Sequence, residues 1–181
     1  MPAWAWSWRA LSRGARGGRH DARARAAVEA AQRGEGAVAP DGAAVVAWRG
    51  RTLFHVVAAL VDAARALREA DPEATVAVVC RSAEAAARTA ALLARGEDGV
   101  RLVRGGDFSF APGVEVTCVQ EVKGLEFDHV VVPDCDGGAY PDGAGSRRAL
   151  YVAMTRASHQ LVLATVANWS PVLRGALQPQ P

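Results

Sequence analysis

Lysine is almost absent from this chain, although basic residues as a group are not. Lys123 is the single lysine among 21 lysines and arginines. A Walker A phosphate loop, G-x-x-x-x-G-K-[ST], needs a lysine to reach the β- and γ-phosphates of a nucleotide and a following hydroxyl residue to hold Mg²⁺. Lys123 is followed by Gly124, so no such loop occurs within the 181 residues. This excludes a self-sufficient P-loop ATPase from the sequence in hand.

Clustered cysteines and histidines and long apolar runs are also lacking. Cys80, Cys118 and Cys135 show no C-x-x-C spacing and the four histidines are scattered, so we expect neither a zinc site nor a disulfide framework. No apolar run reaches the roughly 18 residues that a membrane span needs, and no signal-peptide core follows the tryptophans near the start. The sequence therefore predicts no membrane association and a reducing, cytoplasmic location.

Positive charge is concentrated at the beginning of the chain. Residues 1–34 hold seven arginines against two acidic residues, whereas acidic residues outnumber basic ones in the remainder. The Arg-, Gly- and Ala-rich composition is typical of a solvated, poorly ordered segment, and contact with a phosphate backbone is the alternative. We expect a basic low-complexity segment over 1–40, a folded domain over 41–168 and a Pro-containing tail over 169–181.

Apolar runs of strand length alternate with helical patterns from residue 43 onward. The patterns predict strands at 43–48, 75–80, 100–103, 114–119, 130–132 and 160–165, and helices at 53–70, 83–95 and 147–157. Continuously apolar strands separated by helices are typical of a mostly parallel sheet that is covered on both faces. The sequence thus predicts an α/β fold in three layers, α/β/α, with ligand-binding residues in loops that follow the strands.

One loop between two predicted strands carries an informative motif. Residues 116–128 read VTCVQEVKGLEFD, so a strand runs into a polar loop with Lys123 and then returns to an apolar strand. The contiguous K-G-L-E-F resembles motif V of the UvrD/Rep-type superfamily 1 DNA helicases. An ordinary surface loop with a solvated lysine is the plain alternative, but a chain that otherwise avoids lysine makes it the weaker one.

Two further segments resemble motifs of the same family. Residues 147–157 read RRALYVAMTRA and are similar to motif VI, Y-V-[AG]-x-T-R-A, which places Arg156 at the end of a helix packed on the sheet. A solvated arginine on an amphipathic helix is the alternative for that segment taken alone. Residues 76–82, VAVVCRS, resemble motif IV more weakly, with Arg81 at the end of a strand. The resemblance covers about residues 74–166.

The resemblance implies the C-terminal RecA-like domain of a UvrD/Rep-type helicase, nearest to the helicase IV/HelD-like branch. In this family ATP binds between two RecA-like domains, and the second supplies arginines that neutralise charge on the γ-phosphate. Arg156 is implied to be the principal arginine finger and Arg81 a second γ-phosphate contact. Glu126, which would bind the ribose, and Gly124 match the nucleotide-binding part of motif V.

The phosphates and Mg²⁺ would be held by a Walker A-containing RecA-like domain, in cis or in trans. Asp134 follows a strand as a Walker B acid does, but Pro133 intervenes, so a turn or capping role is expected rather than metal binding. Lys123, together with Gln120 and Thr117, matches the part of motif V that faces single-stranded DNA. Many relatives carry histidine where Gln120 stands, which leaves that contact less defined.

The implied function is the C-terminal half of an ATP-dependent DNA helicase or translocase, inactive as an isolated chain. HelD-like proteins bind RNA polymerase, which adds a further partner. The alternative function is a non-catalytic interaction module that binds nucleic acid or RNA polymerase, or a decayed helicase fragment.

Overall fold

The computed structural model describes residues 44–173, so the predictions for residues 1–40 lie outside the described residues. Strands and helices follow one another in the order β1 (Ala44–Arg49), α3 (Leu53–Ala70), β2 (Thr75–Cys80), α4 (Ala83–Leu93), β3 (Val100–Leu102), β4 (Gly113–Cys118), β5 (Phe127–Val132), α5 (Ala144–Met154) and β6 (Ala157–Thr165). Within 44–173, no helix has the length and apolar character that crossing a bilayer requires.

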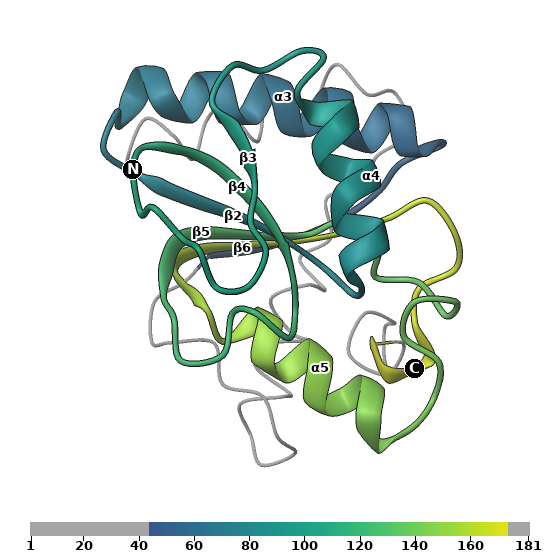
Figure 1. The fold of residues 1–181 in the computed structure, drawn as a ribbon. Helices are drawn as coiled ribbons and strands as arrows, with labels where there is room; N and C mark the ends of the chain where they lie inside the picture. Colours follow the sequence, from purple (N-terminus) through teal and green to yellow (C-terminus); the bar gives the residue numbers. More distant parts are fainter. Residues whose placement is uncertain (1–43, 174–181) are drawn as a thin grey trace.

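The six strands form one sheet in the order β1-β6-β5-β2-β4-β3, and every neighbouring pair is parallel. Helices α3 and α4 cover one face of the sheet and α5 covers the other (Figure 1). These layers confirm the predicted three-layer α/β fold. Because all strands point the same way, they end at one edge, here called the carboxyl edge, and begin at the opposite amino edge. The carboxyl edge lies on the right in Figure 1.

Side chains alternate between two cores, as the two-residue period of a strand requires. In β2, Ala77 and Val79 face the α5 side, whereas Val78 and Cys80 face α3 and α4. β5 and β6 follow the same rule over residues 130–132 and 161–164, which explains why these stretches are continuously apolar rather than alternating with polar residues. Both faces of the central strands are therefore buried.

Several boundaries differ from the prediction, and β5 and β6 each begin three residues earlier than the predicted 130 and 160. Helix α5 runs over Ala144–Met154 rather than 147–157, because the Thr155 hydroxyl donates back to the Tyr151 carbonyl and Ala157 already pairs with Phe127 in the sheet. The expected tail also begins too early. Ser170 and Leu173 are buried, and Leu173 packs in the α5-side core, so the folded domain extends to at least Leu173. Periodicity could not reveal either point, since both depend on long-range contacts.

The central strands should dominate the stability of the domain. Leu161→Ala in β6 removes a fully buried side chain from the α5-side core and is expected to lower the free energy of unfolding by about 3 kcal/mol. Leu53→Ala at the exposed start of α3 is the matched control and should change it by less than about 0.5 kcal/mol. Urea denaturation of both variants measures the difference, and equal losses would contradict the core assignment.

Candidate functional site

The two strongest sequence signatures meet at the amino edge of β5 and β6. The crossover 119–126 returns from the end of β4 to the start of β5, and α5 ends just before β6. Arg156, directly after α5, donates from Nη1 to the Leu125 carbonyl at 2.9 Å, and its own carbonyl accepts the Phe127 N–H at 2.9 Å. The K-G-L-E-F loop and the T-R-A turn are thus hydrogen-bonded to each other, although 31 residues separate Leu125 from Arg156.

The Arg156 guanidinium is half-buried and held by its own surroundings. Nε donates to the Val152 carbonyl at 3.1 Å and Nη2 donates to the Thr155 hydroxyl at 3.0 Å, in addition to the bond to Leu125. Guanidinium carries five N–H donors, so these three bonds fix its plane and leave two donors for a ligand. Its position at the carboxyl-terminal end of α5 is electrostatically favourable, since helix ends of this kind carry partial negative charge.

Residues 122–126, which include most of K-G-L-E-F, divide between a buried anchor and exposed positions. Val122 is fully buried in the α5-side core and fixes the crossover, whereas Lys123, Gly124 and Glu126 are exposed. Gly124 has φ +82°, a conformation that costs other residues energy, so glycine is required there for backbone reasons. Glu126 follows Leu125, the residue that binds Arg156. The structure therefore brings a carboxylate and a guanidinium to one part of the amino edge.

Asp128 links three strands at the amino edge. Its Oδ2 accepts hydrogen bonds from the Thr75 N–H at 2.9 Å and the Thr75 hydroxyl at 2.8 Å, and its Oδ1 lies 3.0 Å from Nδ1 of His159. Burial opposes the charged form of Asp128, but the bonds from Thr75 and the nearby His159 lower its pKa on balance. The starts of β2, β5 and β6 are thereby joined around one carboxylate, which stiffens the support of Arg156.

Arg81 lies at the opposite edge from Arg156. It follows β2, where its N–H donates to Asp134 Oδ2 at 2.8 Å, and its guanidinium carbon lies 5.7 Å from the centre of the Tyr140 ring. Strands rise about 3.3 Å per residue, so β2 alone separates the two arginines by roughly 20 Å. The prediction that both arginines contact one γ-phosphate does not fit this arrangement. The motif matches give the residue types, but they do not give the distance between the two side chains.

Asp134 is consistent with the predicted capping role, since it binds the first backbone N–H after β2. No group of three metal-binding side chains occurs in the part of the chain that the structure describes. The residues that were predicted to contact DNA lie in different environments. Gln120 is exposed just beyond β4 at the carboxyl edge, but Thr117 is fully buried and directs its hydroxyl to the Val103 carbonyl at 3.5 Å. Thr117 therefore has no surface for DNA.

The motif matches did not identify three exposed arginines at the carboxyl edge. Arg49 ends β1, Arg51 follows it, and Arg104 comes two residues after β3. Helices α3, α4 and α5 all begin at the same edge, and Figure 1 shows α3 and α5 starting on the right. The available signal was the placement of arginines directly after predicted strands, which does not depend on any family motif.

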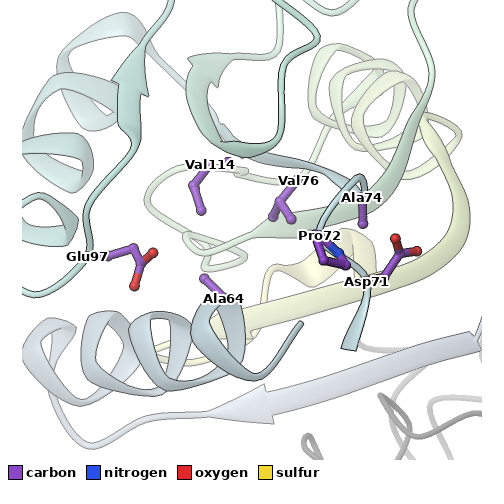
Figure 2. A pocket seen from close by; sticks show the side chains of 8 residues that line it. Ala64, Asp71, Pro72, Ala74, Val76, Glu97 and Val114 are labelled. Carbon is purple, nitrogen blue, oxygen red and sulfur yellow. The ribbon is translucent and has the colours of Figure 1, made fainter. Parts of the chain in front are cut away.

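One pocket in the described part of the chain is lined by none of the predicted site residues. It lies between α3 and the starts of β2 and β4, on the face opposite α5 (Figure 2). Figure 2 shows Ala64, Val76 and Val114 around it, with the Glu97 side chain entering from one side. A lining of small apolar groups and carboxylates, with Asp71 at the rim, repels phosphate, so this pocket is not a candidate for the triphosphate.

Asp134 should make stability depend on pH. Burial raises its pKa to about 6 from the ordinary 3.8, so the folded protein holds a proton that the unfolded chain releases between those values. Stability is then lost as pH rises from about 4 to about 6. Asp134→Asn keeps an acceptor for Arg81 and should be about 2–3 kcal/mol more stable than the wild type at pH 7.5, with no difference near pH 4.

Thermal or urea unfolding across this pH range measures the effect, and Asp62→Asn on exposed α3 controls for the loss of one negative charge. A wild type and an Asp134→Asn variant with parallel pH profiles would contradict the buried-carboxylate explanation.

Comparison with known proteins agrees with this geometry. Residues 113–164, which contain both signatures, match the family model of the UvrD-like helicase C-terminal domain. The fold is similar to the C-terminal domain of a possible DNA helicase from Lactobacillus plantarum WCFS1, with TM-score 0.63 and 26% identity over 88% of this chain and 93% of that one. No match was found among curated proteins.

A second structure supports the fold alone. Dbp5 of S. cerevisiae, solved with Nup159, Gle1, IP6 and ADP, is 15% identical with TM-score 0.53, over 97% of this chain and 48% of that one. Nothing in these matches distinguishes the helicase IV/HelD-like branch, which stays a prediction. The all-parallel sheet, the meeting of the two signatures at Arg156 and the match over residues 113–164 together support a helicase C-terminal domain that is similar to the UvrD-like type.

Proposed function

We propose that this chain is the C-terminal half of an ATP-dependent DNA helicase or translocase. Arg156 and Glu126 contact a nucleotide that is held by a Walker A-containing RecA-like domain, in cis or in trans. The carboxyl edge binds single-stranded DNA. The observation that carries the proposal is the hydrogen bond of 2.9 Å between Arg156 Nη1 and the Leu125 carbonyl, which brings the two signatures together beside Glu126.

The amino edge suits one wall of a nucleotide site. An arginine whose plane is already fixed can meet phosphate oxygens through its remaining N–H groups, and its charge is permanent. The exposed Glu126 carboxylate can accept hydrogen bonds from ribose hydroxyls. When bound, ATP supplies the phosphoryl group and Mg²⁺ neutralises its charge, whereas this chain stabilises the charge that develops at the γ-phosphate. Arg81 takes no part in this wall.

The carboxyl edge suits a polyanion. Three helices begin there, each with partial positive charge at its start, and Arg49, Arg51 and Arg104 add exposed full charges. The amino edge carries the helix ends and exposed acidic residues such as Glu73 and Glu126. Backbone phosphates bind such an edge without sequence preference and in a salt-dependent way. Gln120 adds a neutral hydrogen-bonding group, and Lys123 lies further along the crossover.

This function places the protein in the cytoplasm, where ATP and DNA are available and its three buried, unpaired cysteines remain reduced. The alternative function, a non-catalytic module that binds nucleic acid or RNA polymerase, shares the carboxyl edge but needs no finger at Arg156. The two functions therefore differ in what Arg156 does once a first domain is present.

The isolated chain is expected to hydrolyse no ATP, and adding a purified Walker A-containing UvrD-type first domain should give turnover stimulated by single-stranded DNA. Arg156→Ala should lower that turnover by about 10³–10⁵-fold, the range known for arginine fingers. Arg148→Ala, an exposed arginine on the same helix, is the matched control and should change it little. Arg81→Gln at the opposite edge should cost far less than Arg156→Ala.

Steady-state ATPase assays with and without oligonucleotide measure all four proteins. Turnover that Arg156→Ala leaves unchanged would overturn the finger assignment. Tight DNA binding with no turnover under any pairing would favour the non-catalytic module instead.

A further inference from the structure

One corner of the carboxyl edge combines exposed apolar side chains with arginines. Phe54, in the first turn of α3, is 72% exposed, the highest value among the large hydrophobic residues that the structure describes as exposed. Leu53 and Val166 are also exposed. The Gly50 N–H donates to the Thr165 carbonyl at 2.8 Å, so the ends of β1 and β6 lie side by side and bring these residues to one place. We call Arg49, Arg51 and Phe54 the β1–α3 corner, with Leu53 and Val166 as its neighbours.

The charges of this corner are of one sign. Arg49 and Arg51 are exposed, and no ion pair among residues 44–173 engages either of them. Arg49 makes only a long hydrogen bond, 3.4 Å, to the Asn168 side chain. The corner itself contains no carboxylate. A ligand that fits it therefore offers negative charge and a flat apolar face together, at neighbouring positions.

Single-stranded nucleic acid has this composition, because phosphates alternate with bases whose faces are free to stack. A duplex hides those faces, and a protein partner would have to pair acidic groups with apolar ones. β1 is the outermost strand, and the edge spans about 24 Å from β1 to β3, since neighbouring strands lie about 4.8 Å apart. One extended strand of nucleic acid can thus pass from the corner toward Gln120 and Arg104.

We propose that Phe54 is a base-stacking residue for single-stranded nucleic acid, with Arg49 and Arg51 holding the adjacent phosphates. This inference rests on the proposed function only in that it uses the same edge for nucleic acid. It adds a stacking site outside the segment that matches the helicase family model, which begins at residue 113.

Fluorescence anisotropy with two labelled probes tests the inference on the full chain at low salt. The probes are a short oligothymidylate and an abasic oligonucleotide of equal length, which keeps the phosphates but has no bases. Wild type should prefer the oligothymidylate, and Phe54→Ala should weaken that probe by about tenfold while leaving the abasic probe unchanged. Phe54→Trp should restore binding, with indole fluorescence quenched as the oligothymidylate is added.

Leu53→Ala is the matched control, because it removes a neighbouring exposed apolar side chain without removing a ring; it should stay within about twofold of wild type. Arg51→Gln should weaken both probes and lower the salt slope by about 0.7. Equal losses for Phe54→Ala and Leu53→Ala, or equal losses on both probes, would overturn the stacking role.

The outcomes separate this inference from the proposed function. If wild type binds neither probe, the nucleic-acid part of the proposed function fails, and the stacking role fails with it. If wild type and Phe54→Ala bind both probes equally well, only the stacking role fails. In that case, loss of association between Phe54→Ala and the Walker A-containing domain would assign the corner to domain docking.

Discussion

Because every strand of the sheet runs in the same direction, residues that follow strands and residues that precede them are separated by the full height of the sheet. Arg81 follows β2 and Arg156 precedes β6, so the two lie at opposite edges. The same rule sends the starts of all three helices to the carboxyl edge and their ends to the amino edge. The placement of both arginines and of the helix ends follows from this one direction.

The crossover between β4 and β5 joins the two edges, as every connection between parallel strands does. It contains no helix, and within eight residues it passes from Gln120 at the carboxyl edge to Glu126 at the amino edge. Buried Val122 fixes its middle and Arg156 binds its end at the Leu125 carbonyl. A displacement of the Arg156 guanidinium therefore acts on a short, anchored segment rather than on a flexible loop.

Hydrophobic patterning predicts the secondary structure correctly where neighbouring residues in the sequence determine it. The β2 bounds, 75–80, and the strand–loop–strand setting of K-G-L-E-F were predicted from apolar runs and turn residues, and the structure confirms both. The burial of Thr117 and the docking of Leu173 were not predicted, because each depends on residues far away in the sequence. Arg81 shows a third kind of failure, since a short motif names a residue type but the strand direction decides which ligand it can meet.

Preorganisation distinguishes Arg156 from the other arginines of α5 and its surroundings. A catalytic charge is most effective when its orientation is fixed before the reaction, because little reorganisation is then needed as charge develops. Arg156 is half-buried with three donors engaged by Val152, Leu125 and Thr155, whereas Arg148 is exposed on the same helix. Those three bonds use protein carbonyls and a hydroxyl, which are neutral, so they orient the guanidinium without neutralising it. Its full charge therefore remains available to an anionic ligand.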